Sequence, residues 1–255
     1  MKIRILGCSG GIGLGHRTTS LLLDDSVLID CGTGLGDLSS DEMSKLQHVF
    51  ITHSHLDHIA LLPMLLDTAY DHLVNKPLTL HCKQETYDVL AKNIFNWEVW
   101  PNFFELPTVE TPVIIYESMQ PGDCIEFGDK IVKMVEVNHA VPAAAYIINN
   151  GTGSIAFSGD TFTNDTFWHA LNEEPRMDMV IVECGFTNEE KNIGRDAKHF
   201  YPNALAEDLK KLNHRPDLYI THLQPGREES IMQQLDSEIS DFKIHQLSSG
   251  QVITI

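Results

Sequence analysis

Three histidines and one aspartate lie within a single six-residue run of this sequence. The run is HSHLDH, containing His53, His55, Asp57 and His58, and it directly follows the apolar, β-branched run HVFIT. Imidazole nitrogens and carboxylate oxygens together suit Zn²⁺, Mn²⁺ or Fe, so this density of ligand-type side chains predicts metal binding. His53 and His55 alternate and can face one point, whereas Asp57 and His58 fall at the start of a helix and can face a second. We therefore expect one loop to serve two metal ions about 3.5–4 Å apart.

Further ligand-type residues occur just after apolar strands elsewhere in the chain. His139 follows KIVKMVEVN, Asp160 follows SIAFSG and His222 follows DLYIT. Strand ends meet at the rim of a sheet, where loops carry functional side chains, so we expect these three residues to gather beside the HSHLDH run. Asp30 also ends an apolar run, VLID, but it lies well ahead of the cluster. We interpret Asp30 as a carboxylate that orients a ligand rather than one that binds metal.

Apolar runs define the strands that must position these residues. Strands are predicted at residues 2–7, 19–23, 26–30, 48–52, 78–82, 113–116, 124–127, 131–138, 144–148, 154–158, 179–182 and 218–221, with two short strands at the end of the sequence. Helices are predicted at residues 59–73, 84–95, 202–212 and 228–240. No linker or low-complexity segment interrupts this pattern, which favours one domain over residues 1–255, built of two sheets packed face to face with helices outside.

The charge balance restricts the partners of the protein. Its 18 Lys and Arg residues stand against 36 Asp and Glu residues, giving a formal net charge of −18. Such a surface repels phosphate backbones, so stable binding to nucleic acid or to an anionic membrane is not expected. No run approaches about 20 apolar residues, and the first residues lack the long apolar stretch of a secretory signal. Five widely spaced cysteines without a C-x-x-C motif are typical of a reduced, cytoplasmic protein with buried thiols.

The HSHLDH run, with His139, Asp160 and His222 downstream, resembles the ligand pattern of the metallo-β-lactamase superfamily, and the likeness extends over almost the whole chain. The resemblance implies an α+β fold, the αββα four-layer sandwich, with a dinuclear site at one edge. It implies two divalent metal ions as cofactors, for which Zn²⁺ is favoured and Mn²⁺ or Fe are alternatives. One metal would be held by His53, His55 and His139 and the other by Asp57, His58 and His222, with Asp160 bridging them.

Asp160 also bears on the reaction. True β-lactamases of the superfamily often carry cysteine at this position, so the aspartate disfavours hydrolysis of a β-lactam. An aspartate bridge instead resembles that of the phosphodiesterases and related hydrolases of the superfamily.

Three segments resemble the class II cyclic-nucleotide phosphodiesterases. They are the opening GCSGG…TTSLLLDDSVLIDCGTGLGDL, the HSHLDH run followed by NIFNWEVWPNFFELP, and the pair AKHFYPNALAEDLKKL and ITHLQP. The resemblance implies hydrolysis of 3′,5′-cyclic nucleotides, cAMP or cGMP, to 5′-monophosphates by a hydroxide that bridges the metals. The chain departs from that family in IALLPML, which lacks the usual small residues, and in Thr161-Phe162, where Thr-Gly is usual. These departures leave both nucleotides as candidates.

Residues outside the ligand set complete the predicted reaction. His199 resembles the histidine that related phosphodiesterases place against the phosphate, and imidazole titrates near neutral pH, which suits a proton donor to the leaving 3′ oxygen. An exposed loop histidine is the alternative interpretation. Asp57 is expected to accept or relay the proton of the attacking water. His16 and Arg17, in the glycine-rich loop, are candidate contacts to the substrate phosphate.

An aromatic-rich segment follows the second predicted helix. Aromatic faces can stack on a purine base, but packing in the core or against a second copy of the chain is the favoured interpretation. Members of the resembled family often dimerise, which makes a homodimer a candidate assembly. The aromatic residues are Phe95, Trp97, Trp100, Phe103 and Phe104.

Other classes of protein stay open as alternatives. A tRNA 3′-processing endonuclease shares the ligands, but it needs a basic arm for tRNA, and this acidic chain shows no such insertion. A lactone or thioester hydrolase of the superfamily would differ in substrate rather than in metal site. A non-enzymatic binding module is disfavoured, because such a domain would be expected to have lost ligands and all seven positions are filled here.

Overall fold

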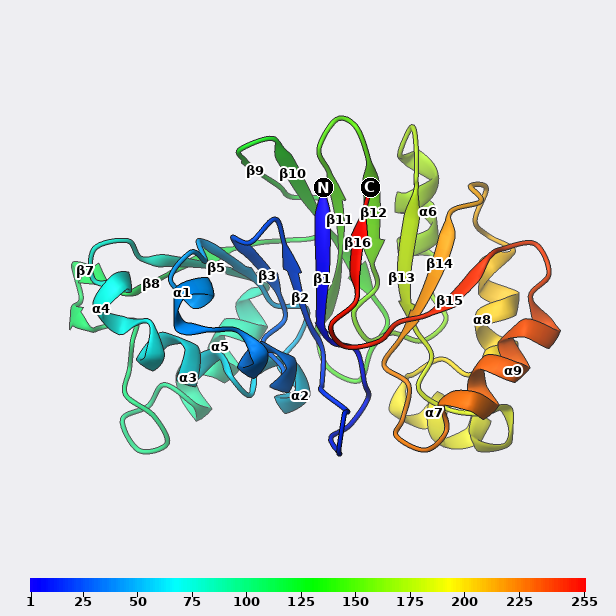
Figure 1. Ribbon diagram of the computed structural model, residues 1–255, viewed down its shortest axis with the longest axis horizontal. Coiled ribbons are helices and arrows are strands. Elements are labelled where there is room, and N and C mark those ends of the chain that lie inside the picture. The colour runs from blue at the N-terminus through cyan, green and yellow to red at the C-terminus, as the bar shows by residue number, and fades with distance from the viewer.

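Two seven-stranded sheets form the centre of the computed structural model, which describes residues 1–255. The helices of the first half of the chain lie on the outer side of one sheet, and the later helices lie on the outer side of the other (Figure 1). The layers therefore follow in the order helix, sheet, sheet, helix. This arrangement confirms the predicted αββα sandwich.

The first sheet combines the early strands of the chain with its last strand. Strands β3 to β5 and β8 run parallel, whereas β16, β1, β2 and β3 pair antiparallel. In spatial order the strands are β16 (Val252–Thr254), β1 (Lys2–Gly7), β2 (Ser20–Leu23), β3 (Val27–Ile29), β4 (His48–Phe50), β5 (Leu78–Cys82) and β8 (Ile114–Ser118). A separate small hairpin is formed by β6 (Pro107–Thr108) and β7 (Thr111–Pro112).

The second sheet brings several strand ends to one edge. In spatial order its strands are β15 (Ile244–Gln246), β14 (Asp217–Thr221), β13 (Met179–Glu183), β12 (Ser154–Phe157), β11 (Ala143–Asn149), β10 (Lys130–Val137) and β9 (Cys124–Phe127). Strands β10 and β12 are both antiparallel to β11, and β12, β13 and β14 are parallel to one another. The carboxyl ends of β10, β12, β13 and β14 therefore lie along the same edge.

The helices form two outer layers. Those beside the first sheet are α1 (Ser40–Met43), α2 (Leu56–Ile59), α3 (Leu62–Thr68), α4 (Tyr70–Leu73) and α5 (Gln84–Asn93), with the 3₁₀ turn η1 (Thr33–Asp37). Those beside the second sheet are α6 (Thr166–Glu173), α7 (Lys191–Ala197), α8 (Pro202–Leu209) and α9 (Glu228–Glu238), with the 3₁₀ turn η2 (Asn188–Glu190). None of these helices is long and apolar enough to cross a bilayer.

Side-chain alternation along the strands divides the buried residues into three apolar clusters. In β4, Val49 packs under the first helical layer, whereas the next residue, Phe50, points between the sheets and meets Tyr146 and Phe157. Successive strand residues face opposite sides, so one strand can serve two layers. The third cluster lies between the second sheet and its helices and contains Trp168. Both faces of each sheet are thus covered, which explains the continuous apolar runs.

The structure corrects one predicted helix and the predicted burial of one cysteine, and it adds helices that were not predicted. The segment 59–73 does not form one helix, because α2, α3 and α4 divide it. Pro63 occupies the first turn of α3, where its missing N–H is harmless, so it begins a helix there instead of continuing one. Helices α1, α6 and α7 were not predicted. All five cysteines are free thiols, and Cys124 is exposed rather than buried.

Candidate metal centre

The predicted ligands come together at one edge of the two sheets. The HSHLDH run follows β4 of the first sheet, while His139, Asp160 and His222 follow β10, β12 and β14 of the second. These side chains form two groups, and within each group the ligand atoms lie within 4.8 Å of one another. Asp160 belongs to both groups. Divalent metals suit this donor set of imidazoles and carboxylates.

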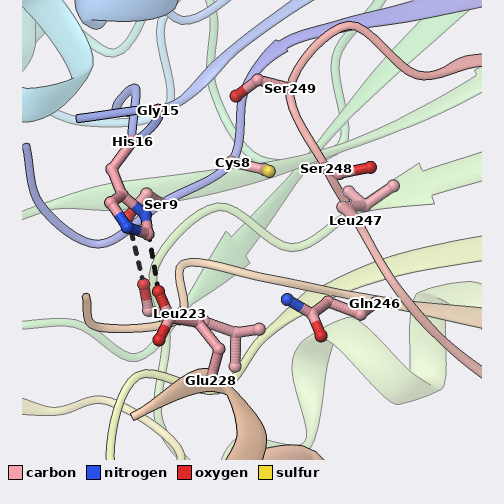
Figure 2. Close-up of a pocket in the computed structure, with 10 residues that line it drawn as sticks. All are labelled: Cys8, Ser9, Gly15, His16, Leu223, Glu228, Gln246, Leu247, Ser248 and Ser249. Carbon is pink, nitrogen blue, oxygen red and sulfur yellow. Dashed lines mark hydrogen bonds and ion pairs between the residues drawn. The ribbon is translucent and has the colours of Figure 1, made fainter. Parts of the chain in front are cut away.

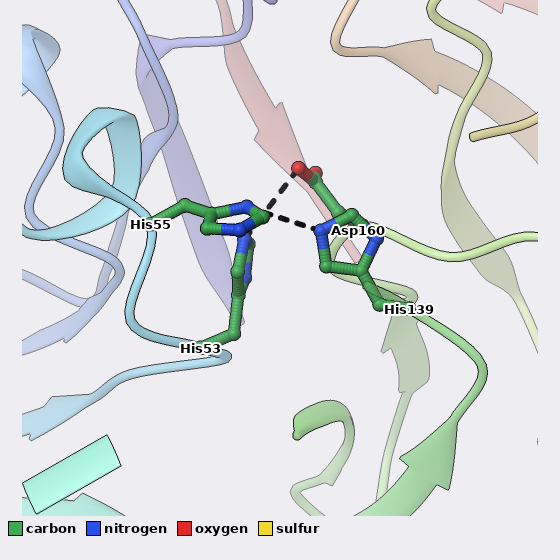
Figure 3. Close-up of side chains that lie close together, drawn as sticks. All are labelled: His53, His55, His139 and Asp160. Carbon is green, nitrogen blue, oxygen red and sulfur yellow. Dashed lines mark hydrogen bonds and ion pairs between the residues drawn. The ribbon is translucent and has the colours of Figure 1, made fainter. Parts of the chain in front are cut away.

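The first group contains three imidazoles and the shared carboxylate. Its members His53, His55, His139 and Asp160 point toward one another from three separate loops (Figure 3). His139 Nε2 lies 3.1 Å from His55 Nδ1, and His53 Nε2 lies 3.7 Å from Asp160 Oδ2. His53 is fully buried, so this group is closed on its inner side.

The second group adds a carboxylate of its own. It contains Asp57, His58, His222 and the shared Asp160. His222 Nε2 lies 3.2 Å from both Asp57 Oδ2 and Asp160 Oδ2, so it faces the two carboxylates at once. His58 Nε2 lies 3.2 Å from Asp160 Oδ2 and 3.4 Å from Asp57 Oδ2.

The hydrogen-bonding state of the buried nitrogens fits a bound cation. His53 Nε2 and His58 Nε2 are both buried and have no hydrogen-bond partner in the chain. The His58 nitrogen is close to two carboxylates, but it lacks the alignment of a hydrogen bond with either. A buried polar atom without a partner is costly, on the order of 1–3 kcal/mol. A metal ion in each group would satisfy these nitrogens and neutralise Asp57 and Asp160.

Asp30 supports ligand residues of both groups from behind. His58 Nδ1 donates to Asp30 Oδ2 at 2.7 Å, which turns Nε2 toward the cluster. Thr52 donates its backbone N–H and its hydroxyl to the same carboxylate, and the hydroxyl oxygen accepts from His53 Nδ1 at 3.0 Å. Asp30 therefore fixes His58 directly and His53 through one hydroxyl, as a carboxylate behind ligand histidines does.

Main-chain contacts hold two further ligand candidates, His139 and His222. His139 Nδ1 donates to the carbonyl of Lys198 at 3.1 Å, leaving Nε2 toward the cluster. His222 has a φ of 61°, a left-handed conformation that is rare for a residue other than glycine. Its N–H donates to the carbonyl of Cys8 at 2.7 Å. Glycine is required at position 10 because a Cβ there would lie 2.6 Å from the His222 carbonyl oxygen.

Burial and carboxylates act in opposite directions on the histidines. Burial lowers the pKa of His53 well below its ordinary value and lowers that of His139 to about 4. Burial also opposes charge on His222, but the Asp160 and Asp57 carboxylates raise its pKa to about 10. The pKa of His58 is raised in the same way by Asp160 and Asp30. Protons thus occupy the second group when no cation is present, because its carboxylates need positive charge beside them.

His199 stands against both groups and has a carboxylate partner of its own. Its ring stacks on His222, with centroids 5.0 Å apart, and meets His139 edge-on at the same separation. His199 Nδ1 donates to Glu183 Oε1 at 2.9 Å. Burial alone would lower the pKa of His199, but the Glu183 carboxylate raises it above its ordinary value. The Nε2 atom makes no hydrogen bond within the chain and is available to a substrate.

Comparison with known proteins agrees with this geometry. A family model described as the β-lactamase superfamily domain matches residues 25–223 of the chain. The chain belongs to the metallo-β-lactamase superfamily. The matched span contains the HSHLDH run, His139, Asp160, His199 and His222, so the candidate metal centre of this hydrolase fold lies inside it.

Two curated relatives and one solved structure indicate how similar this chain is to known proteins. A probable 3′,5′-cyclic-nucleotide phosphodiesterase of Yersinia pestis is 25% identical over 261 residues, covering 83% of this chain and 72% of that protein. A ribonuclease Z of Methanococcus maripaludis is 31% identical over 156 residues, which cover 58% of this chain and 48% of that protein. The structure of unliganded yeast PDE1 superposes with a TM-score of 0.85 at 18% identity, covering 100% of this chain and 99% of that chain. At that identity, the structural likeness shows the fold alone.

Two residues at the centre were not predicted from the sequence. Glu183 is fully buried at the end of β13, and its carboxylate also accepts from the backbone N–H of Thr161 at 3.0 Å. It ends an apolar strand as Asp30 does, so the same strand-end pattern could have identified it. Lys198, whose carbonyl holds His139, follows α7 in a left-handed conformation with φ 58°. No sequence pattern marks Lys198.

The predicted phosphate contacts His16 and Arg17 lie outside both groups. His16 Nδ1 is 3.4 Å from Glu228 Oε1, and the two side chains line a separate pocket of about 150 Å³ together with Cys8 (Figure 2). Arg17 Nε is 3.5 Å from Asp37 Oδ1. The structure does not bring either residue into contact with the ligand candidates, so their role toward phosphate stays a prediction.

The aromatic segment belongs mainly to the core of the first helical layer. Phe95 and Phe103 are buried there, and Trp100 and Phe104 pack against the same cluster. Trp97 is the exception, since 58% of its surface is exposed. Packing in the core, one of the two predicted roles, therefore describes most of this segment.

Proposed function

We propose that this protein hydrolyses 3′,5′-cyclic nucleotides to 5′-monophosphates. The observation that carries the proposal is the position of His199, which lies against both ligand groups and is anchored by Glu183. A proton donor beside two candidate metal positions is the arrangement that hydrolysis of a phosphodiester needs. The similarity to the phosphodiesterase of Yersinia pestis, which extends over most of both chains, supports the same choice of substrate.

The proposal includes the assignment of ligands. His53, His55 and His139 would hold one divalent metal and Asp57, His58 and His222 the other, with Asp160 belonging to both groups. Zn²⁺ is the favoured ion, with Mn²⁺ or Fe as alternatives, because all three accept imidazole and carboxylate. Bound metals would supply charge neutralisation at the phosphoryl oxygens and would make water more acidic at neutral pH.

The residues of the chain then handle the protons. Addition of water to phosphorus releases one proton and breaks the bond from phosphorus to the 3′ oxygen. Asp57 accepts or relays the proton of the water. His199 donates a proton from Nε2 to the 3′ oxygen as that oxygen leaves, while Glu183 keeps the imidazole in place through Nδ1.

The setting of the reaction is part of the same proposal. The substrate is a small molecule, and the chain forms no stable complex with nucleic acid, because its formal net charge of −18 repels polyanions. A single domain spanning residues 1–255, a cytoplasmic location and assembly as a homodimer complete the proposal. The free thiols support the location, since thiols persist in reducing compartments.

A ribonuclease of the tRNA 3′-processing kind is the second candidate. The similarity to ribonuclease Z favours it, although the matched residues span only about half of that relative. The charge of this chain opposes binding of tRNA, because each phosphate contact normally requires a basic side chain. Cleavage of a tRNA precursor by the metal-loaded protein would support this candidate over the cyclic-nucleotide reaction.

Turnover of 3′,5′-cAMP and cGMP by the purified, metal-loaded protein tests the proposal. We expect 5′-monophosphate as product, with a loss of about 10²–10⁴-fold in His199→Ala because proton donation contributes that much to catalysis. His169→Ala is the matched control, since His169 is exposed on α6 and should leave the rate unchanged. Comparison substrates are 2′,3′-cAMP, bis-p-nitrophenyl phosphate and a lactone. No turnover of either cyclic nucleotide, with rapid turnover of the lactone, would overturn the proposal.

A further inference from the structure

An open pocket of about 410 Å³ adjoins the candidate centre on the side of His139. The loop between β10 and β11 forms one wall, and Lys83, Glu85 and Lys198 complete the rim. Its size is in the range of small-molecule sites, and it shares His139 with the first ligand group. A substrate bound at the centre could extend into this pocket.

Lys83 occupies a helix position that lysine does not favour. It is the N-cap of α5, where Ser, Thr, Asp or Asn is favoured, and its side chain makes no capping hydrogen bond. A cationic residue is also disfavoured at this position, because the N-terminus is the positive end of a helix. The side chain is nevertheless only 7% exposed. Breaches of local preference of this kind concentrate at functional positions.

The contacts of Lys83 do not account for its burial. Its one acceptor in the chain is Glu136 Oε1, at 3.3 Å. An ammonium has three N–H donors, so two of them have no partner in the chain. The Glu136 side chain is 57% exposed, and ion pairs with an exposed partner contribute little to stability. The unpartnered N–H groups of Lys83 are therefore available to a ligand in the pocket.

The lining of the pocket selects the kind of ligand. Lys83 and Lys198 carry two formal positive charges, which Glu85 and Glu136 balance. A phosphate group in this pocket would be repelled by both carboxylates, so the two lysines would add little to its binding. A neutral group with both donors and acceptors, such as a nucleobase with its ribose hydroxyls, fits it better, because lysine N–H groups and glutamate oxygens can both be used.

We propose that this pocket is the nucleoside subsite of the enzyme and that Lys83 hydrogen-bonds the nucleoside of a cyclic nucleotide whose phosphate lies at the metal centre. The proposal rests on the proposed function and adds to it the part of the chain that recognises the substrate. Lys83 is a substrate-binding residue here and takes no part in the proton transfers assigned to His199 and Asp57.

Lys83→Ser tests this role without loss of the helix, because serine is a favoured N-cap. We measure the ratio of kcat/KM for cAMP to that for bis-p-nitrophenyl phosphate, which has no nucleoside. We also measure the Kd of 5′-AMP by equilibrium dialysis and the thermal unfolding midpoint. The ratio should fall about tenfold or more, and the Kd should rise by a similar factor, as expected for a lost charge-assisted hydrogen bond. The midpoint should stay the same or rise.

Lys76→Ser is the matched control. It removes the same charge from an exposed position and should change neither the ratio nor the Kd. Lys83→Met, which keeps the apolar stem of the lysine, gives the same test if the serine variant is destabilised. Turnover of cAMP with an unchanged ratio in both Lys83 variants would overturn the nucleoside subsite alone. Turnover of bis-p-nitrophenyl phosphate without turnover of any cyclic nucleotide would overturn the proposed function, and the subsite with it.

Discussion

The two ligand groups of the candidate centre share Asp160 but differ in what else they offer a cation. The first group contributes three imidazoles, and burial keeps His53 and His139 neutral by lowering their pKa values. The second group contributes Asp57 and two imidazoles, with Asp30 directly behind one of them. Carboxylates there raise the pKa values of His58 and His222.

This difference makes the two candidate metal positions unequal, although they are built from similar residues. A cation entering the first group meets neutral nitrogens and one carboxylate. A cation entering the second group displaces protons but gains a second carboxylate. We therefore expect tighter binding at the second group near neutral pH, with affinity there falling as the pH falls.

Replacing the shared carboxylate should have the largest effect, because both groups lose an anionic ligand together. Asp160→Asn keeps the size of the side chain, so metal content should fall at both positions and hydrolysis of bis-p-nitrophenyl phosphate should drop by more than about 100-fold. Elemental analysis after dialysis measures the metal. Asp129→Asn, in an exposed turn, is the control and should change neither quantity. Two metals per chain in Asp160→Asn would contradict a shared ligand.

Asp30→Asn should weaken metal binding more at the second group than at the first. Loss of the carboxylate behind a ligand histidine typically weakens metal binding by about 10–100-fold, and we expect that loss at the second group, where Asp30 contacts His58 directly. The first group should weaken less, because Asp30 reaches His53 only through the Thr52 hydroxyl. Competition with a chromogenic chelator measures both affinities, and circular dichroism checks the fold. Equal weakening at both groups would show that the direct contact has no special role.

Stepwise removal of metal should reveal the order of affinity without any mutation. We expect two steps on addition of chelator, with the first-group metal leaving at a concentration about tenfold lower, because that group has one carboxylate fewer. His139→Ala should remove the early step, and Asp57→Asn should remove the late one. A single step would contradict unequal affinities at the two positions. Loss of the late step in His139→Ala, or of the early step in Asp57→Asn, would contradict the expected order.

His81, a buried histidine outside the centre, tests whether burial lowers the pKa of a histidine in this protein. His81 stacks on Phe50, and burial, with His48 adding to the effect, lowers its pKa from 6.5 to about 3. The nearest carboxylate, Glu117 Oε2, is 3.5 Å away and half exposed. The unfolded chain binds this proton first, so the free energy of unfolding should fall by about 1 kcal/mol between roughly pH 6.5 and 5.5 and continue to fall toward the folded pKa.

His81→Phe should remove that component of the pH dependence. Urea unfolding of the metal-free proteins at several pH values measures it, and subtracting the two curves cancels the contributions of the ligand histidines. Identical pH dependence in the two proteins would mean that burial does not keep His81 neutral beside the half-exposed Glu117 carboxylate.

The sequence was most informative where chemistry and periodicity coincide. Asp160 and His222 each follow a continuous apolar run, and such a run must be a buried strand. A strand end fixes where the next residue lies, so the gathering of these side chains could be predicted before any helix was placed. The resemblance to a known superfamily then supplied the division into two groups, which spacing alone does not give.

What the sequence did not reveal depends on contacts between distant segments. Helix α6 is short, and its Trp168 is held by the carboxylate of Asp208, which accepts from Trp168 Nε1 at 2.9 Å across 40 residues of chain. Helix α7 has Gly194 inside it, and glycine lowers helix propensity by about 1 kcal/mol. Neither helix has a local pattern strong enough to predict it, yet α7 leads directly into Lys198 and His199.

The pairing of β1 with β16 joins two strands that are synthesised far apart in time. The amino group of Met1 donates to the carbonyl of Ile255 at 2.8 Å, a contact between residues 254 positions apart. The sheet that carries the HSHLDH run therefore receives the strand beside β1 only after the other strands of both sheets have been synthesised. Contacts this distant in sequence form slowly, and an unpaired edge strand is a template for other chains. Until β16 pairs with it, β1 is an unpaired edge that other chains can use for aggregation.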